Sequence, residues 1–286
     1  MEITIILANY NGGEHLAEAL ASLKNQSHKK WRLVIFDDGS TDNSLQTAQA
    51  FVDAIPNTQL LRHQDGVNKG LPQTLQEALA RVETPWVAFL EHDDIWHEDY
   101  LKEKLALIKK YPQAGIIYNP AEPFGTLARV KKLSLYYKAV NFYTKLLNPF
   151  TKAYVLNFAL MGFNPVPAFS CVMAKTDTIK AADFNAPFAP WLDWWVWAQL
   201  SFKNKFYYLD KKLTRWRLHD KSYTVQTLRE AGQKHKHFKT ALFGLYKNNM
   251  PAAKFYTYRC LTAVGAFALG LALAPVKLCR RHKNLL

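Results

Sequence analysis

The chain has 286 residues, with 37 Lys+Arg against 23 Asp+Glu, a formal net charge of +14 and 49% hydrophobic residues. This length and apolar content exclude a disordered or collagen-like chain and suffice for a sizeable core. The three cysteines are widely spaced, which excludes a disulfide framework and a zinc pattern and favours a reducing compartment. Glu2 stands where a signal peptide would carry basic residues, so we expect no secretion signal.

The charge is unevenly distributed along the chain. Residues 1–123 hold 11 basic and 17 acidic residues, a net charge of −6, whereas residues 124–286 hold 26 and 6, a net charge of +20. A uniformly basic chain would suggest a nucleic-acid partner, but an acidic half joined to a basic half suggests two different tasks. We therefore expect no nucleic-acid partner.

The first 120 residues alternate short β-branched runs with amphipathic stretches, a pattern typical of a βαβ sheet. Strands are predicted at residues 3–8, 32–36, 58–62 and 85–90, and helices at residues 16–23, 45–52 and 71–82. The second strand runs into Asp37-Asp38 and the fourth into Glu91-His92-Asp93-Asp94. Because ligands of open parallel sheets bind beyond the carboxyl ends of the strands, both acidic groups are predicted to face one shared site.

The second half of the chain differs in composition. Residues 124–165 are basic and apolar together, and no internal repeat or low-complexity linker separates them from the first half. The pattern then predicts a strand at 167–174, a Trp-rich helix at 189–202, strands at 205–209 and 213–218, and helix from about 225 to the end.

The acidic residues at the strand ends are the most informative feature of the sequence. Two Asp-Asp pairs follow strands, and Asp193 lies far downstream in the Trp-rich helix. Carboxylates gathered around a cleft bind a hard divalent cation, which neutralises a diphosphate, and a further carboxylate can act as general base. A turn followed by a helix cap would explain either pair alone, but both pairs together favour a site.

Five segments in order resemble the family 2 glycosyltransferases of the GT-A fold. They are Ala8-Asn9-Tyr10-Asn11, residues 34–42, residues 89–96, Leu192-Asp193-Trp194-Trp195 and Arg217-Leu218-His219. The resemblance covers residues 3–220 and implies an α/β GT-A fold, a Rossmann-like mixed sheet flanked by helices, with a C-terminal helical extension. It implies a catalytic domain at 1–220, with a nucleotide-sugar half at 1–123 and an acceptor half at 124–220, and a helical, membrane-associating segment at 221–286.

The resemblance also implies roles for the residues of the first half. Ala8 and Tyr10 would line the base pocket, with the Tyr10 ring stacked on uracil or thymine. Asp37 would accept a hydrogen bond from the pyrimidine ring nitrogen. Asp93 would hold the ribose, and Asp94 would hold Mg²⁺ or Mn²⁺, which stabilises the leaving diphosphate.

In the second half, Asp193 resembles the catalytic base of inverting members. On a helix with 100° per residue, Asp193 lies opposite Trp191, Trp194 and Trp195, which are expected in the core. Trp197 falls beside Asp193, so we expect it to stack on an acceptor sugar. Arg217 and His219 alternate on one strand face and are expected at the diphosphate or acceptor, a strand-edge salt bridge being the alternative.

Residues 260–276 form a run of 17 residues without charge, rich in Ala and Gly and followed by basic residues. A monotopic anchor on anionic lipid is the preferred interpretation. An ordinary packed helix and a transmembrane helix stay open as alternatives. We therefore expect a cytoplasmic protein that is peripheral on the inner face of the cytoplasmic membrane.

The function expected from the resemblance is inverting, metal-dependent transfer from a UDP- or dTDP-sugar to a hydroxyl of a glycan or lipid-linked acceptor. Bacterial surface polysaccharide or lipopolysaccharide synthesis is the expected setting, with rhamnosyltransferase-like members as the subtype. An NAD-dependent oxidoreductase would need Gly-x-Gly-x-x-Gly after the first strand, and a sugar nucleotidyltransferase a glycine-rich basic loop. Both are absent from the N-terminal sequence. A non-catalytic glycan- or nucleic-acid-binding protein stays open.

Overall fold

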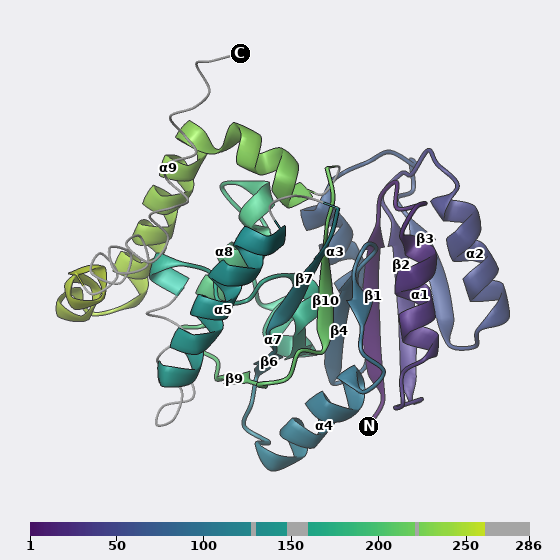
Figure 1. Ribbon diagram of the computed structural model, residues 1–286, viewed down its shortest axis with the longest axis horizontal. Coiled ribbons are helices and arrows are strands. Elements are labelled where there is room, and N and C mark those ends of the chain that lie inside the picture. The colour runs from purple at the N-terminus through teal and green to yellow at the C-terminus, as the bar shows by residue number, and fades with distance from the viewer. Residues whose placement is uncertain (127–129, 148–159, 221–222, 261–286) are drawn as a thin grey trace.

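A mixed seven-stranded sheet forms the centre of the molecule within the residues that the computed structural model describes, 1–126, 130–147, 160–220 and 223–260 (Figure 1). Its strand order is β3-β2-β1-β4-β8-β6-β9. The strands are β1 (Ile3–Asn9), β2 (Trp31–Asp37), β3 (Thr58–Arg62), β4 (Trp86–Glu91), β6 (Ile116–Tyr118), β8 (Val172–Lys175) and β9 (Phe206–Tyr208). This mixed sheet, flanked by helices, confirms the predicted α/β class.

The first four strands of the sheet are parallel, and β8 is antiparallel to both β4 and β6. The register pairs Asn9 of β1 with Asp37 of β2, and Ala8 of β1 with Glu91 of β4. The carboxyl ends of these three strands therefore meet at one edge of the sheet, as the sequence predicts.

A smaller three-stranded sheet joins strands that lie far apart in the sequence, one of which directly follows the second acidic motif. Its order is β5-β10-β7, with β5 (Ile95–Trp96), β7 (Ala121–Gly125) and β10 (Thr214–Leu218). Thr214 pairs with Trp96, directly after Asp93-Asp94, in an antiparallel register. This pairing brings the segment after Thr214 to the carboxyl end of β4 from more than a hundred residues away.

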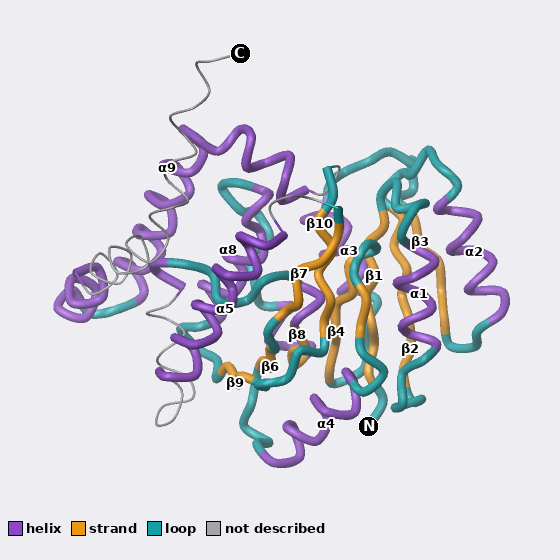
Figure 2. Tube along the Cα trace, viewed as in Figure 1, coloured by secondary structure: helices purple, strands orange, loops and turns teal. Residues whose placement is uncertain are grey.

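Helices cover both faces of the large sheet (Figure 2). One core contains α1 (Leu16–Lys24), α2 (Ser44–Ala54) and α4 (Tyr100–Lys110). The other contains α3 (Leu71–Ala80), α5 (Val130–Leu147), α7 (Thr176–Lys180), α8 (Leu192–Leu200) and α9 (Tyr223–Asn249). Ile5 faces the first core and Ile6 the second, which explains why apolar residues on both faces of β1 are buried.

One predicted strand differs from the observed one, and two others are confirmed. The strand expected at 167–174 exists only as β8, because residues Phe169–Cys171 form a 3₁₀ turn. Ser170 hydrogen-bonds with other elements instead: its hydroxyl accepts the Glu91 N–H at 2.9 Å, and its carbonyl accepts Trp96 Nε1–H at 2.8 Å. The strands expected at 205–209 and 213–218 form β9 and β10, which lie in different sheets.

The segment proposed as a membrane anchor from its composition, residues 260–276, lies outside the described residues apart from Cys260. In the described part of the chain, no helix has both the length and the apolar composition that crossing a bilayer requires. The preceding helix α9 packs on the second hydrophobic core, because Phe238, Leu242 and Tyr246 are fully buried in it.

Candidate active site

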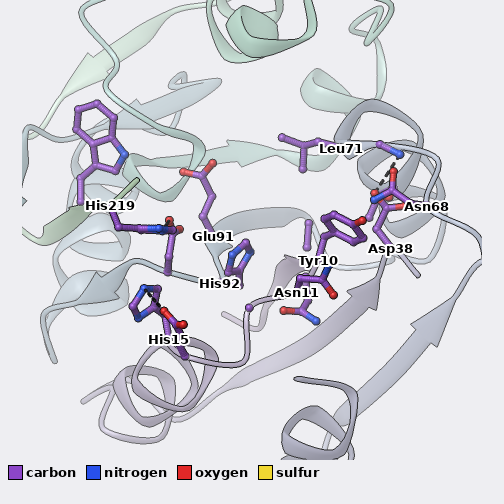
Figure 3. A pocket seen from close by; sticks show the side chains of 17 residues that line it. Tyr10, Asn11, His15, Asp38, Asn68, Leu71, Glu91, His92 and His219 are labelled. Atoms are coloured by element: carbon purple, nitrogen blue, oxygen red, sulfur yellow. Dashed lines mark hydrogen bonds and ion pairs between the residues drawn. The ribbon is translucent and has the colours of Figure 1, made fainter. Parts of the chain in front are cut away.

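A cavity of about 570 Å³ opens where the carboxyl ends of β1, β2 and β4 meet (Figure 3). Two groups of side chains occupy opposite ends of it. Tyr10, Asp38, Asn68 and Leu71 mark one end, and His15, Glu91 and His219 mark the other. The two ends therefore differ in chemistry: one presents the Tyr10 ring, and the other is an acidic end that also carries histidines.

At the end that presents the Tyr10 ring, Tyr10 and Asp38 have contrasting environments. The Tyr10 side chain is 45% exposed and presents its ring to the cavity, whereas Asp38 is only 4% exposed. The Asp38 carboxylate accepts hydrogen bonds from the backbone N–H of Lys69 at 2.7 Å and of Gly70 at 3.0 Å. Ala8, on β1, lines the same cavity.

The structure corrects the expectation for Asp37. Its side chain is fully buried and does not line the cavity. It accepts hydrogen bonds from Asn9 Nδ2 at 2.8 Å and from the Ser40 N–H at 3.0 Å, and Arg62 Nε lies 3.6 Å from its Oδ1. Asp37 is still the last residue of β2, and the alternation of side chains along a strand turns it away from the cavity that Asp38 faces.

At the acidic end, Asp93 and His219 are the closest pair, with His219 Nε2 3.1 Å from Asp93 Oδ2. Both line the cavity together with Glu91. Arg217 supports this pair from behind: its Nε donates to the Asp93 carbonyl at 2.8 Å, and its guanidinium pairs with Glu18. Arg217 itself is not among the cavity-lining residues, so it braces the site without facing it.

The structure also corrects the expectation that Asp94 holds a metal ion. The side chain is fully buried, and its Oδ1 accepts the backbone N–H of Arg217 at 2.9 Å. Its other oxygen has no hydrogen-bond partner among the described residues. Because Asp94 follows the tight turn in which its N–H donates to the Glu91 carbonyl, its side chain points into the protein rather than the cavity.

The acidic end carries more negative charge than its surroundings neutralise. Burial, followed by the charges of Asp94, Asp93 and Asp193, raises the pKa of Glu91 well above its usual range. Burial and the neighbouring Asp93 charge likewise raise the pKa of Asp94. Burial also opposes ionisation of Asp93, but the hydrogen bond from His219 and the charges of His92 and His219 together outweigh burial, so the pKa of Asp93 lies below its usual value. A bound cation would relieve this accumulation of carboxylates.

The donor groups present fit a divalent cation that shares its coordination with a ligand. Among the described residues, no three His, Cys, Asp or Glu side chains are grouped to hold a metal ion alone. The cavity nevertheless presents a carboxylate on Asp93 and an imidazole on His219, with Glu91 nearby. Mg²⁺ and Mn²⁺ are commonly bound by one or two side chains together with ligand phosphates.

Asp193 occupies the first turn of α8 and is partly exposed. Its carboxylate accepts a hydrogen bond from Asn164 Nδ2 at 2.7 Å. Burial raises the pKa of Asp193 to about 7, and its charge in turn raises the pKa of Glu91. Asp193 is therefore electrostatically linked to the acidic end, with an acid–base equilibrium close to neutral pH.

The expectation for Trp197 is wrong. Its side chain is fully buried, and its ring packs against Phe169 with centroids 5.1 Å apart, so it offers no surface to a sugar. The helix-wheel argument placed Trp197 beside Asp193, but α8 is packed on nearly every side. Trp194 is buried as expected, whereas Trp191 and Trp195 are partly exposed.

Several cavity residues were not predicted as site residues from the sequence. They include Asp38, Asn68, Leu71, Glu91, His15 and Trp216. Asp38 and Glu91 belong to the acidic motifs at the strand ends. The motifs predicted a site there, but they did not indicate which residue of each motif faces the cavity. For His15 and Trp216 the sequence carried no signal, because only the folded chain brings α1 and β10 to this cavity.

The sheet, its helices and the cavity at the carboxyl ends of its parallel strands define the GT-A fold. A family model described as glycosyl transferase family 2 matches residues 4–173, more than half of the chain. The chain belongs to this family.

One curated relative is an Escherichia coli UDP-Glc:α-D-GlcNAc-diphosphoundecaprenol β-1,3-glucosyltransferase, 28% identical over 108 residues, which are 38% of this chain and 41% of that protein. The matched region spans only about two fifths of the length of the first curated relatives.

Two solved structures show the same fold. S. aureus TarS 1–349 in complex with UDP-GlcNAc has a TM-score of 0.64 and 15% identity, over 94% of this chain and 73% of that one. A Pyrobaculum calidifontis mannosyltransferase in complex with GDP-Man and Mn²⁺ has a TM-score of 0.58 and 13% identity, over 98% and 81%. At these identities the likeness concerns the fold.

Proposed function

We propose that the protein is an inverting glycosyltransferase that moves a sugar from a UDP- or dTDP-sugar to a hydroxyl of a glycan or lipid-linked acceptor. The observation that carries the proposal is the cavity whose two ends suit the two parts of a nucleotide diphosphate. Tyr10 and Asp38 suit a base, and Asp93 with His219 suits a metal-bound diphosphate. Family membership and the TarS complex with UDP-GlcNAc support it.

At the base end, Tyr10 stacks on the pyrimidine ring and Asp38 accepts the hydrogen bond that we first expected Asp37 to accept. Asp38 is suited to this because its carboxylate reaches the cavity while backbone N–H groups fix its orientation. An ionised carboxylate only accepts hydrogen bonds, so it favours a ring N–H and disfavours a ring nitrogen with a lone pair. This disfavours adenine and cytosine, and together with the pyrimidine donors that the resemblance implies it leads us to propose a uridine or thymidine nucleotide.

At the acidic end, Asp93 and His219 would hold Mg²⁺ or Mn²⁺, in place of Asp94. When bound, the cation stabilises the negative charge that develops on the departing diphosphate. The P. calidifontis neighbour, crystallised with Mn²⁺ and a nucleotide sugar, supports this assignment. Arg217 keeps Asp93 in place through its carbonyl, and Asp94 anchors the backbone of Arg217.

Asp193 acts as general base in this proposal. Its carboxylate takes the proton of the acceptor hydroxyl as that oxygen attacks the anomeric carbon, and the bond from that carbon to the diphosphate breaks on the opposite side. The amide of Asn164 holds one carboxylate oxygen, and the pKa of about 7 suits a base that must release the proton again.

Bacterial surface polysaccharide or lipopolysaccharide synthesis is the proposed setting, on the inner face of the cytoplasmic membrane. The undecaprenol-linked acceptor named for the E. coli relative supports a lipid-linked acceptor. On α5, Leu135 and Phe142 are 59% and 64% exposed, and Lys138 is exposed on the same face. An apolar helix face with a basic residue and no nearby acid suits an anionic membrane surface.

A nucleotide-sugar panel tests the proposal. The full chain with Mg²⁺ or Mn²⁺ is titrated with UDP-, dTDP- and GDP-sugars, dTDP-rhamnose included because of the rhamnosyltransferase-like resemblance, and thermal shift and donor hydrolysis are followed. We expect protection by uridine or thymidine species alone. The Asp193→Asn variant should keep this protection and lose transfer. Protection by no nucleotide sugar would favour a glycan- or nucleic-acid-binding protein instead.

Vesicle sedimentation tests the membrane part separately. We expect salt-sensitive binding to vesicles containing phosphatidylglycerol and weaker binding to neutral phosphatidylcholine vesicles. Phe142→Ser should weaken binding, whereas Lys102→Ser, an exposed residue on the distant helix α4, should not. Equal binding to both vesicle types at all salt concentrations would refute the electrostatic part.

A further inference from the structure

His63 lies directly beneath the carboxylate that faces the base end of the cavity. It follows β3, and its side chain has no exposed surface. Its Nε2 is 3.0 Å from Asp38 Oδ1, and its Nδ1 is 3.1 Å from Glu77 Oε2 on α3. The imidazole thus connects a cavity-lining carboxylate to a carboxylate at the protein surface.

The hydrogen bonds fix the orientation of this ring. Ionised carboxylates accept hydrogen bonds and donate none, so a ring nitrogen of His63 that carries a proton donates it to the carboxylate beside it, Nε2 to Asp38 and Nδ1 to Glu77. Thr74 Oγ1 lies 3.1 Å from Nε2, and the Phe36 ring packs on the imidazole with centroids 4.9 Å apart. A ring held at both nitrogens and on one face does not rotate, so it defines the place of Asp38 Oδ1.

The position of Asp38 in turn organises a wall of the cavity. Its Oδ1 receives His63 and the Lys69 N–H, and its Oδ2 receives the Gly70 N–H. Gly39 allows the same loop to approach closely, because its φ is +75° and a Cβ there would lie 2.6 Å from the Asn68 nitrogen. The loop that carries Asn68 to the cavity is therefore attached to the carboxylate that His63 holds.

We propose that His63 is a positioning residue for donor recognition, which holds the Asp38 carboxylate in the orientation that accepts the ring N–H of a pyrimidine base. This inference rests on the proposed function. His63 is buried and is not among the residues that line the cavity, so it acts on a nucleotide only through Asp38. It adds a determinant of base specificity that lies outside every motif of the sequence.

Two variants separate the two hydrogen bonds of the ring. In His63→Gln, the side-chain amide nitrogen takes about the place of imidazole Nε2 and keeps a donor toward Asp38. In His63→Asn, the amide nitrogen takes about the place of Nδ1 and keeps a donor toward Glu77. Both variants remove the ring from Phe36, so they form a matched pair in which mainly the direction of the retained donor differs.

The affinity for UDP, measured by calorimetry with Mg²⁺ present, is the first readout. We expect His63→Gln to bind within about threefold of the original chain and His63→Asn to bind at least about tenfold more weakly, the loss of one hydrogen bond to a charged group. Glu77→Gln, which leaves the contact with Asp38 intact, should change the affinity little. In turnover, His63→Asn should raise the donor KM more than it lowers kcat.

A UDP analogue methylated at the ring N3 gives the second readout. The original chain and His63→Gln should bind it far more weakly than UDP, whereas His63→Asn should discriminate less. If the original chain binds neither UDP nor dTDP, the proposed function fails. If it binds UDP but both variants bind equally well, or lose affinity only in proportion to their loss of thermal stability, the positioning role is overturned.

Discussion

The two Asp-Asp pairs, at the ends of β2 and β4, present their carboxylates in opposite order. At β2, Asp37 is buried and Asp38 faces the cavity, whereas at β4, Asp93 faces the cavity and Asp94 is buried. All four carboxylates contact groups of the protein, but only Asp38 and Asp93 also line the cavity. Identical dipeptides thus divide structural and ligand-binding roles in two ways.

The position at which each strand ends explains the difference. β2 continues through Asp37, which pairs with Asn9 in the sheet, so Asp38 is the first residue beyond the ladder. β4 ends at Glu91, and the turn that closes on the Glu91 carbonyl lies between the strand and Asp94. The local hydrogen bonds, rather than the dipeptide, decide which carboxylate reaches the ligand.

The largest expected effect on transfer comes from substituting the two aspartates of the β4 pair one at a time. Asp93→Asn should reduce transfer by on the order of 10³-fold, because metal-assisted charge stabilisation contributes several kcal/mol. Asp94→Asn should retain transfer within about tenfold, because the amide oxygen still accepts the Arg217 N–H. Initial rates at saturating donor and Mn²⁺ check this. The reverse ranking would show that Asp94 holds the metal after all.

Asp193 extends the comparison to a carboxylate outside either pair. Because burial raises its pKa to about 7, the fraction of ionised base falls about tenfold for each pH unit below that value, and transfer should fall with it. A pH–rate profile between pH 5 and 8 measures this. Nucleotide affinity in the same range should change less, and a profile flat down to pH 5 would contradict the base assignment.

The same carboxylate makes a separate prediction for stability. Its pKa in the folded protein lies above that of an unfolded aspartate, so the folded state binds more protons between about pH 4 and 7. The contribution of Asp193 to stability should therefore be lost progressively as pH rises through this window. The stability difference between Asp193→Asn and the original chain, measured by denaturation across the window, should shift in favour of the variant as pH rises.

Substitutions in the β2 pair should have smaller effects, with one residue affecting UDP affinity and the other the free energy of unfolding. Asp38→Asn should weaken UDP binding by about tenfold, because an amide no longer presents an acceptor-only edge to the base. Asp37→Ala should leave UDP affinity within about threefold and lower the free energy of unfolding by about 1–3 kcal/mol, since Asn9 and Arg62 lose a buried partner. Calorimetry and urea denaturation of both variants distinguish these outcomes.

Much of this fold was predictable from the sequence, because the spacing of apolar residues identifies long buried strands and amphipathic helices. β5, β6 and β7 were not predicted: they have five residues or fewer, and β7 includes Glu122 and Pro123. The cavity edge was also predictable from the strand ends. Which aspartate of each pair faces the cavity was not predictable. It depends on the residue at which the strand ends and the turn begins, and the sequence does not fix that residue to within one position.

Trp197 and His63 show that the sequence does not reveal which side chains surround a residue. Trp197 was wrongly predicted as a site residue, and His63 was not predicted at all. The helical wheel placed Trp197 beside a proposed base, but the wheel does not reveal that α8 is enclosed by other elements on that side. His63 gave no sequence signal at all, because its role depends on Glu77 and Asp38, which come from other elements. Both cases concern tertiary packing, which periodicity does not encode.

The smallest expected effect is that of substituting Trp197, and it tests whether this residue lies outside the acceptor site. Its indole nitrogen has no hydrogen-bond partner in the described part of the chain, so Trp197→Phe removes ring volume and an unsatisfied donor together. The two changes oppose each other, and the net loss of unfolding free energy should be about 1 kcal/mol. The acceptor KM should stay unchanged, because the ring is fully buried. A rise in acceptor KM without loss of stability would mean that α8 opens during transfer and would return Trp197 to the acceptor site.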